Sequence, residues 1–460
     1  MRKTGLIGDR AFYKRVLKVS IPIMIQMGIT NFVSLLDNIM VGALGTESMS
    51  GVSIVNQFVF IFTLLIFGAV SAAGIFTAQY FGGGDIDGVR YTFRFKMLVN
   101  LGAGILGVAV FSLFGDVLIN LFLHEGESTG DLALAFSEAK RYLTYTVIGL
   151  IPYSLSQVYA STLRETGEQI VPMVASVAAV ITNLIFNLLL IFGYLGFPAL
   201  GVAGAAIATV IARFLEFFIL VVWTHAHKER APFIVGAFRS LYIPAALVKS
   251  VVLKGLPIMV NELLWSFAIT MRNQCYSTRG MDALAATSIS STVFNLFAVV
   301  HMSMGSSIAI LVGNKLGAGE IEEAKEDDKK MIAFSVAIAV VMGAVLFAVS
   351  PLLPRMYDVE PSVREIATYM LIVSAVMMPV YAFAHASYFT IRSGGKVLIT
   401  FLLDCGFMWV VIVPLALALA HLTSMNIYLL YAICQCAEIL KVVLGAILLK
   451  KSNWACRLVD

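Results

Sequence analysis

For a chain of 460 residues, this sequence has little charge, few histidines and few cysteines. Asp, Glu, Lys and Arg make up 13% of it, whereas soluble domains carry about a quarter. With a mean hydropathy of +0.90, a soluble fold around one buried core is excluded. The five cysteines are scattered without metal-type pairing, which favours apolar packing residues. The six histidines form neither H-x-x-x-H nor H-E-x-x-H, so a membrane-embedded enzyme has no support.

Long apolar runs are abundant instead. A run of about 18 or more apolar residues can cross a hydrocarbon layer of ~30 Å as a helix. Twelve such spans are predicted, over residues 17–41, 52–78, 95–114, 142–163, 170–193, 201–224, 251–276, 286–312, 331–353, 366–391, 398–420 and 426–449. These runs are too long and too uniformly apolar for the alternating strands of a β-barrel. The sequence therefore predicts an all-α polytopic membrane protein with twelve transmembrane helices, and no repeated pore segment favours a channel.

The distribution of Lys and Arg predicts the orientation. If the N-terminus is cytoplasmic, most of the 32 basic residues fall in cytoplasmic segments. The outside loops hold Lys140, Arg141, Arg279, Arg355 and Arg364. Apart from the cytoplasmic span ends, where Lys18, Lys96 and Lys254 lie, the spans hold Arg213, Arg272 and Lys441. We therefore expect a multi-pass protein of the cell inner membrane with both termini cytoplasmic. The net charge of +4 is a topology signal and does not indicate a nucleic-acid partner.

The chain contains an internal repeat. Residues 21–90 recur without a gap at 256–325, so that Pro22 matches Pro257 and Gly82 matches Gly317. Six spans precede a basic, proline-bearing segment and six follow it, which predicts an N-lobe at 1–225, a cytoplasmic linker at 226–250 and a C-lobe at 251–460. Because each half has an even number of spans and starts inside, the two lobes are parallel and pseudo-symmetric, a plan common in transporters. The repeat also pairs Asp37 with Arg272.

Polar residues inside spans are functional candidates, because a charge at mid-membrane costs ~2.5–3.5 kcal/mol on insertion scales. Asp37 in the first span has no cation one turn away, so it must be protonated, hydrated or cation-bound, as a coupling-ion site requires; the alternative is a local hydrogen bond near the helix end. Asn183 and Asn187 share one helix face, and Thr209 lies in the next span. Alone, such amides are also common interhelical glue, but a nearby Asp37 favours a cation site.

The remaining intramembrane polar residues are interpreted differently. Arg213 with Glu216, and Glu438 with Lys441, are three residues apart, so each pair can neutralise itself.

Asp404 is expected to reach interfacial water, and His301 and His385 are either neutral core histidines or pocket residues. Pro22 and Pro257 either hinge the first helix of their lobes or merely open those helices.

The sequence resembles the multidrug and toxic compound extrusion (MATE) transporters over essentially its whole length. The resemblance rests on Pro22, on the run Asp37-Asn38-Ile39-Met40-Val41-Gly42-Ala43-Leu44-Gly45-Thr46, and on Gly201-Val202-Ala203-Gly204-Ala205-Ala206-Ile207-Ala208-Thr209. It implies two six-helix lobes around a central cavity and export of organic, often cationic, compounds in exchange for Na⁺ or H⁺. The implied partners are small-molecule drugs and membrane lipid, the chain acts as a monomer, and no cofactor is needed beyond the coupling ion.

Carried over to this sequence, the family's cation-coupling acid falls on Asp37 and its polar pair on Asn183 and Asn187, with Thr209 beside them. These residues imply a possible Na⁺ site with one formal negative charge, since many members have Asp where this chain has Asn187.

The seventh-helix acid of some members falls on Glu262, but the tenth span, with Tyr381 and His385, has no acid. Glu262 is therefore expected to meet polar groups around Arg272 or a cationic substrate. Ion coupling is assigned to the N-lobe, and alternating access to the bending of the first helix. A lipid-linked oligosaccharide flippase of the same superfamily is the alternative, although its pyrophosphate would call for more intramembrane cations than this chain has.

Overall fold

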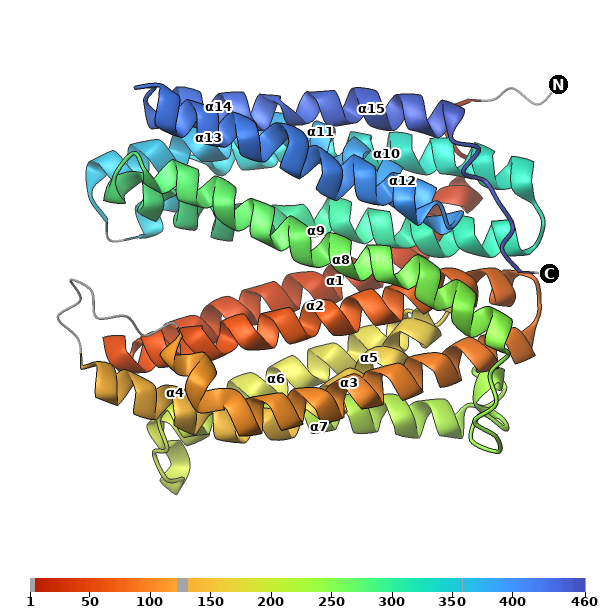
Figure 1. The fold of residues 1–460 in the computed structure, drawn as a ribbon, viewed down its shortest axis with the longest axis horizontal. Helices are drawn as coiled ribbons and strands as arrows, with labels where there is room; N and C mark the ends of the chain where they lie inside the picture. Colours follow the sequence, from red (N-terminus) through yellow and green to blue (C-terminus); the bar gives the residue numbers. More distant parts are fainter. Residues whose placement is uncertain (1–4, 122–130, 358, 460) are drawn as a thin grey trace. The chain divides into compact units, whose positions relative to one another are not determined.

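The computed structural model describes residues 5–121, 131–357 and 359–459, without the side chains of Leu35 and Thr46. The described part of the chain is helical and contains no strand (Figure 1). The first half comprises α1 (Arg10–Gly42), α2 (Thr46–Gly82), α3 (Ile86–Asn120), α4 (Leu132–Thr146), η1 (Val147–Gly149), α5 (Leu150–Glu165), α6 (Ile170–Phe192), η2 (Tyr194–Gly196) and α7 (Val202–Ala226). The all-α fold class predicted from the hydropathy pattern is confirmed.

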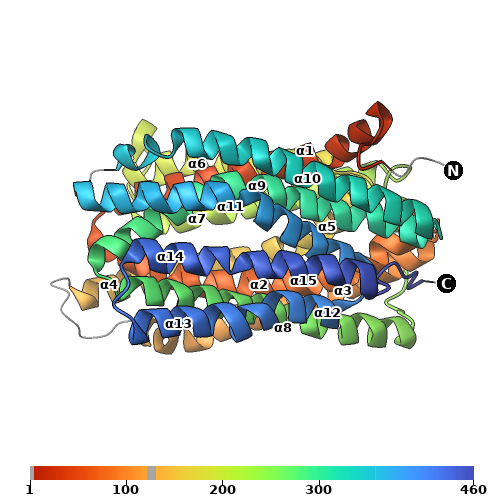
Figure 2. The ribbon, with the colours of Figure 1, turned by 90° about the horizontal axis from the view of Figure 1, so that it is seen from above.

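The second half begins after a short turn, η3 (Pro232–Ile234), and repeats the pattern. It comprises α8 (Ala245–Ser277), α9 (Met281–Gly317), α10 (Ile321–Val349), η4 (Leu353–Met356), α11 (Pro361–Ser393), α12 (Val397–Phe401), the π-helical turns η5 (Leu402–Gly406) and η6 (Met408–Ile412), α13 (Val413–Leu422), α14 (Ile427–Cys436) and α15 (Glu438–Lys451). Segments α12 to α13 form one interrupted rod, and α14 with α15 another, as Figure 2 shows.

The predicted spans coincide with these rods to within a few residues at most ends. Among the described residues, ten helices are long and apolar enough to cross a membrane, with each interrupted rod of the C-terminal half counted once. The two remaining predicted spans are α8, which carries Lys249, Lys254, Glu262 and Arg272, and the α4–α5 rod, which η1 interrupts. Composition and length alone thus find ten of the twelve predicted spans.

The structure reproduces the internal repeat in the register read from the sequence. Helices α1 and α8 are both 33 residues long and start 235 positions apart, and α2 and α9 are both 37 residues long at the same offset. The turns between them match as well, because Gly45 and Gly280 have φ angles of 117° and 108°. Side chains rarely adopt such angles, so glycine is needed at both turns.

Two compact units are distinguished by their internal packing. The N-terminal unit comprises Ile25–Thr77 and Asp85–Gly255, and the C-terminal unit comprises the described residues up to Met24, Ala78–Gly84 and the chain from Leu256 onward. In the first, α6 packs on α7 and α3 on α5; in the second, α11 packs on both α9 and α10.

The division differs from the predicted lobes because two short N-terminal segments pack with the second half. Phe12 and Val16 of α1 belong to a core that includes Met304 and Ile308. At the end of α2, a Cβ on Gly82 would lie 1.8 Å from the carbonyl oxygen of Asn314. Only a glycine permits that backbone approach.

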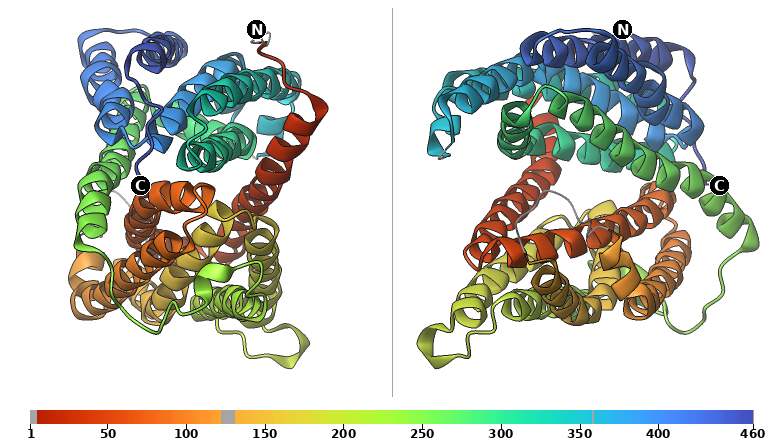
Figure 3. Two further views of the ribbon diagram at one scale, coloured as in Figure 1. Left: turned by 90° about the vertical axis from the view of Figure 1, so that its right-hand side faces the viewer. Right: turned by 60° about the vertical axis from the view of Figure 1, so that its left-hand side comes forward.

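The predicted linker is held against the N-terminal unit, and Figure 3 shows this segment drawn mainly as loop between α7 and α8. Arg94 on α3 donates hydrogen bonds to the carbonyl oxygens of Gly236, Ala237 and Tyr242 at 2.9, 2.7 and 3.0 Å. These bonds satisfy backbone oxygens that no helix or strand would otherwise use.

Candidate functional site

Four of the predicted site residues meet in the N-terminal unit. The Nδ2 group of Asn187 donates to Oδ1 of Asp37 at 2.6 Å and to Oδ1 of Asn183 at 3.2 Å. Asn183 in turn donates from Nδ2 to Oγ1 of Thr209 at 3.2 Å. Helices α1, α6 and α7 therefore contribute to one polar cluster, which we call the Asp37 cluster.

Helix geometry explains why α6 supplies two members of the Asp37 cluster. Asn183 and Asn187 are four residues apart and so lie one turn above each other on the same face. Both are buried, with 6% and 1% of their surface exposed, although the flanking sequence is apolar. Thr209 donates its own hydroxyl to the carbonyl oxygen of Ala205 at 3.0 Å, which fixes its rotamer and leaves its oxygen lone pairs to accept. The cluster is thus preorganised by two regular helices.

Two further groups stand beside the cluster and were missed in the sequence analysis. Tyr142 on α4 is buried and interacts electrostatically with Asp37, and its hydroxyl reaches Oδ1 of Asn56 at 3.5 Å. Arg213 on α7 also acts on Asp37 electrostatically, while its guanidinium lies 4.5 Å from the centre of the Tyr153 ring. Hydropathy placed Tyr142 at the very end of a predicted span, and no spacing rule links either residue to Asp37.

The oxygen atoms of the Asp37 cluster suit a hard monovalent cation or a proton. Carboxylate, amide and hydroxyl oxygens are the ligands that hard cations take. In the structure the amide N–H of Asn187 faces the carboxylate of Asp37, so an N–H dipole occupies the side from which a cation would approach. Rotating that amide would present its oxygen instead. No group of three or more His, Cys, Asp or Glu side chains suited to a metal ion occurs among the described residues, so the cluster does not resemble a transition-metal site.

Nearer the start of α1, a second polar chain crosses the N-terminal unit. Gln26 donates from Nε2 to Oγ of Ser176 on α6 at 2.9 Å, and Ser176 donates to Oε1 of Glu216 on α7 at 2.6 Å. The other end of the Gln26 amide accepts from Nη1 of Arg164 at 3.2 Å. Glu216 also approaches Arg213 at 3.5 Å, which fits the pairing expected from their spacing, but its stronger partner is Ser176.

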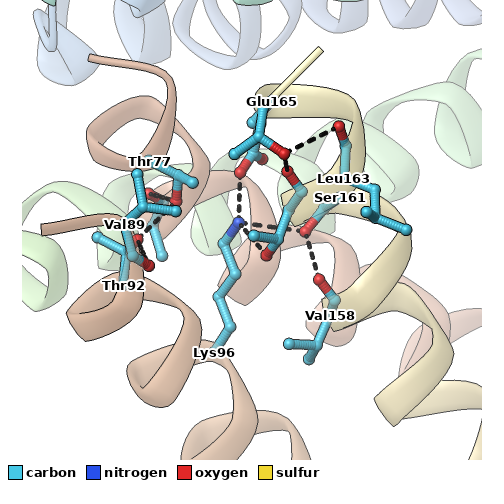
Figure 4. Close-up of polar contacts among 11 residues, drawn as sticks. Thr77, Val89, Thr92, Lys96, Val158, Ser161, Leu163 and Glu165 are labelled. Atoms are coloured by element: carbon cyan, nitrogen blue, oxygen red, sulfur yellow. Dashed lines mark hydrogen bonds and ion pairs between the residues drawn. The ribbon is translucent and has the colours of Figure 1, made fainter. Parts of the chain in front are cut away.

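A buried ion pair lies at the end of α5 that precedes Gly167. Lys96 on α3 places Nζ 2.5 Å from Oε2 of Glu165 and within 3.2 and 3.3 Å of the hydroxyls of Ser161 and Thr162 (Figure 4). The Lys96 side chain is 0% exposed. Nearby, the hydroxyls of Thr77 and Thr92 are 2.9 Å apart. The predicted span begins at residue 95, which places Lys96 among the cytoplasmic basic residues of the predicted orientation.

The alternative expectation, a cationic substrate, stays a prediction, but in the C-terminal unit Glu262 does not meet Arg272. Its Oε1 lies 3.8 Å from Nη1 of Arg392, which also donates to the hydroxyl of Tyr388 at 3.1 Å. The reason is helical: Glu262 and Arg272 both belong to α8 and lie almost three turns apart, whereas Arg392 comes from the end of α11.

Lys441 interacts electrostatically with Glu438, as their spacing predicts, but its ion-pair partner is Asp404. The expectation that Asp404 reaches interfacial water stays a prediction. Nζ of Lys441 lies 2.5 Å from Oδ1 of Asp404, and Asn261 on α8 donates to Oδ2 of the same carboxylate at 3.1 Å. Asp404 sits in the π-helical turn η5. A π-turn shifts the register of the following residues and is frequent at functional sites, and hydropathy carries no signal for it.

The other C-lobe candidates occupy separate surroundings. Arg272 interacts electrostatically with Glu438 and with three tyrosines, Tyr276, Tyr381 and Tyr431. Tyr381 donates its hydroxyl to Oε1 of Gln435 at 2.7 Å. His385 packs edge-on against His301, with ring centres 5.5 Å apart. Electrostatic interactions nevertheless link these residues, because Arg272 interacts with Tyr381, and Glu262 and His385 both interact with Arg392 and Asp404.

Both predicted hinge prolines lie inside long helices. Pro22 interrupts α1, which begins at Arg10, and Pro257 interrupts α8, which begins at Ala245. The alternative that they open their helices is therefore wrong. A proline at an interior position removes one backbone hydrogen bond, so each helix can bend there.

Comparison with known proteins gives several matches. Probable multidrug resistance protein NorM of Thermotoga maritima is 26% identical over 357 residues, covering 77% of this chain and 74% of that protein. Its namesake in Halalkalibacterium halodurans is 25% identical over 434 residues, covering 93% and 91%. The probable multidrug resistance protein YoeA of Bacillus subtilis is 24% identical over 390 residues, covering 84% and 81%.

Solved structures share the fold. A crystal structure of MATE in complex with MaL6 superposes with a TM-score of 0.87 at 19% identity, covering 98% of both chains. An outward-facing multidrug resistance MATE family transporter of the MOP superfamily gives 0.86 at 20% identity, covering 97% of this chain and 98% of that one. A family model, MatE, matches residues 22–189 and 257–419, so its two copies begin at Pro22 and at Pro257, in the register of the internal repeat. This chain belongs to the MatE family of MATE transporters.

Proposed function

We propose that this protein is a secondary active multidrug exporter that exchanges organic, often cationic, compounds for Na⁺ or H⁺ at the Asp37 cluster. The observation that carries the proposal is the 2.6 Å contact between Asp37 and Asn187, which joins the hinged helix α1 to the rest of the N-terminal unit through a single carboxylate. The multidrug resistance names of the relatives support the substrate class.

The charge of Asp37 gives the coupling its physical basis. A carboxylate removed from water needs a proton, a cation or strong hydrogen bonds. A proton on Asp37 replaces the hydrogen bond that Asn187 donates, and a Na⁺ requires the amides to turn their oxygens inward. Either event changes the contacts of α1 with α6, and the inward movement of one charge supplies ~2.3 kcal/mol per 100 mV of membrane potential.

Pro22 allows α1 to bend in response to this change. It lies fifteen residues before Asp37 on the same helix, so a change in the contacts of Asp37 can bend α1 at the proline. Bending alters the wall available to the substrate and favours its release outside. Aromatic and methionine side chains, which repack around varied apolar cations, are abundant at 31 Phe, 16 Tyr and 20 Met.

The cellular setting follows from the charges. We propose a monomer of the inner membrane. Its termini are placed in the cytoplasm because the basic residues concentrate on one side. A flippase for a pyrophosphate-linked lipid is less well supported, since Arg392 and Lys441 are already engaged by Glu262 and Asp404.

Proteoliposome efflux tests the proposal. Release of a fluorescent organic cation is followed under separately imposed Na⁺ and pH gradients, for the native chain and for Asp37→Asn. The amide retains the shape of the carboxylate but carries no charge. We expect Asp37→Asn to abolish gradient-driven efflux while the protein remains folded.

Thr224→Val is a matched control, because the buried Thr224 hydroxyl donates to the carbonyl oxygen of Leu220 within its own helix at 2.6 Å. It should retain gradient-driven efflux. Full efflux by Asp37→Asn would overturn the coupling role, and loss of ion dependence in Asn183→Ala with Asn187→Ala identifies the amides as ligands.

A further inference from the structure

Helix α1 is fastened to the N-terminal unit at a second point, distinct from the Asp37 cluster. Gln26 lies four residues after Pro22 and is bonded to both Ser176 and Arg164. Its place is notable because the described residues of α1 change unit between Met24 and Ile25. Gln26 is therefore in the first turn of α1 that packs with the N-terminal unit, between the hinge and Asp37.

The C-terminal unit holds α8 in the same manner. Asn261 lies four residues after Pro257, and the repeat pairs it with Gln26. It donates to Oδ2 of Asp404 at 3.1 Å, and its own Oδ1 accepts from the backbone N–H of Cys405 at 3.3 Å. In both units, an amide four residues after the proline thus bonds a short polar side chain on the fifth predicted span of the same half.

The third residue of each hydrogen-bonded chain also has a counterpart in the other unit. Glu216 lies fourteen residues after the start of α7 at Val202, and Lys441 lies fourteen residues after the start of α14 at Ile427. Ser176 bonds Glu216 at 2.6 Å, as Asp404 bonds Lys441 at 2.5 Å.

The neighbouring charges correspond too, with inverted sign. Arg213 lies three residues before Glu216, and Glu438 lies three residues before Lys441. The order is Arg then Glu in α7, and Glu then Lys in α15. The geometry is therefore conserved between the halves while the charges are reversed.

We propose that the two chains are equivalent clips that dock the hinged helix of each unit, and that Glu216 is the positioning residue whose charge sets the strength of the clip on α1. We call them the Gln26 clip (Gln26, Ser176, Glu216) and the Asn261 clip (Asn261, Asp404, Lys441). The inference rests on the proposed function, because it assigns α1 the moving role that ion coupling requires.

The two clips differ in strength for a physical reason. In the Asn261 clip, the acid is itself the middle member and is held by a direct ion pair with Lys441, whose side chain is 10% exposed. In the Gln26 clip, the middle member is a neutral serine, and the acid behind it faces Arg213 at 3.5 Å, which is 39% exposed. Hydrogen bonds to a charged acceptor are roughly twice as strong as neutral ones. Neutralising Glu216 therefore weakens the hold on α1 and leaves α8 docked.

The charged and titratable groups around Glu216 come from α5 and from its own helix, α7. Arg164 and Tyr153, both from α5, interact with it electrostatically, and Arg213 flanks it on its own helix. From α6 and α1 only the neutral Ser176 and Gln26 are in hydrogen-bond contact with the chain. Arg164 also bonds Gln26, so removing the charge of Glu216 by substitution changes a network that already includes α1.

Hydrogen–deuterium exchange in lipid nanodiscs tests the proposal, with the full chain and one fixed labelling pH. The variants are Gln26→Ala, Ser176→Ala and Glu216→Gln, and the control is Ser154→Ala, a buried serine bonded to the carbonyl oxygen of Leu150 on its own helix. We expect residues 25–36 to exchange about tenfold faster in all three clip variants, while residues 260–271 and the control are unchanged. Asn261→Ala should loosen 260–271 alone.

A double variant separates a clip from general destabilisation. Because Gln26 and Glu216 act through one chain, Gln26→Ala with Glu216→Gln should exchange no faster than the faster single variant, whereas independent effects would multiply. In proteoliposomes, Glu216→Gln should lower the maximal rate of efflux more than it lowers the apparent substrate affinity.

Unchanged exchange of residues 25–36 in Glu216→Gln, or multiplied effects in the double variant, would overturn the clip. That result would leave the Asp37 cluster standing if Asp37→Asn still abolishes coupled efflux. Coupled efflux by Asp37→Asn would instead overturn the proposed function, whatever the exchange data show.

Discussion

At the scale of single residues, the buried Lys96–Glu165 pair is the most exacting arrangement in the N-terminal unit. Taking both charges out of water is costly, and the pair is tolerable because Nζ of Lys96 is also met by the hydroxyls of Ser161 and Thr162. Gly74 makes room for this carboxylate, because a Cβ at that position would lie 2.3 Å from Oε1 of Glu165. Each partner therefore depends on the other being charged.

We accordingly expect Lys96→Met to destabilise the protein by about 3–5 kcal/mol, because it leaves the buried Glu165 carboxylate without its ion-pair partner. The midpoint of thermal unfolding in detergent measures the loss. The double variant Lys96→Met with Glu165→Gln should recover most of it, since no charge then remains buried. A double variant as unstable as Lys96→Met alone would show that packing around the lysine, and not its charge, is what matters.

At the scale of elements, the chain after α15 is not a loose tail. Gln79, near the end of α2, donates to the carbonyl oxygens of Ser393 and Cys456 at 3.0 and 3.2 Å and accepts from the N–H of Leu458 at 2.6 Å. Trp454 is 5% exposed, and a Cβ on Gly394 would lie 1.7 Å from its carbonyl oxygen. One amide side chain thus fastens the segment 453–459 to the C-terminal unit.

Gln79→Ala should release that segment. Three hydrogen bonds to backbone groups are lost together, so we expect hydrogen exchange within 453–459 to rise at least tenfold, corresponding to ~1.4 kcal/mol or more. Gln169→Ala is the matched control: it is another buried glutamine, bonded to the carbonyl oxygen of Arg164 at 3.0 Å. Equal exchange of 453–459 in both variants would contradict the fastening role of Gln79.

The elements also show what the sequence can predict and what it cannot. Span positions and the repeat were predictable because apolar length and glycine turns are local signals, as the equal lengths of α1 and α8 illustrate. The grouping of Asp37 with Asn187 was predictable only through the family resemblance. The pairing of Asp404 with Lys441 was not, because it depends on helix rotation and on the π-turn η5, which no local pattern encodes.

At the scale of the whole molecule, the two units combine a common scaffold with different charges. The repeat keeps Pro22 and Pro257, and the amides that follow them, in matching places. The charged third residue of the clip is Glu216 in one unit and Lys441 in the other. In the internal repeat, Asp37 has Arg272 as its counterpart. Ion sensitivity is therefore expected in the N-terminal unit, where Asp37 faces the amide donor of Asn187, and rigidity in the C-terminal unit, where Glu262 and Asp404 are paired with cations.

The orientation of the whole chain can be tested with one matched pair of substitutions. Glu229 in the segment before α8 and Glu360 before α11 are both exposed, and each can be changed to cysteine in a chain whose Cys436 and Cys456 are replaced by serine. Because the basic residues Lys228, Arg230 and Arg239 surround the first position, we expect it to be cytoplasmic. A membrane-impermeant thiol reagent should then label Glu229→Cys only in inside-out vesicles and Glu360→Cys only in right-side-out ones. Labelling of both positions from the same side would contradict the twelve-span topology, since an odd number of predicted spans lies between them.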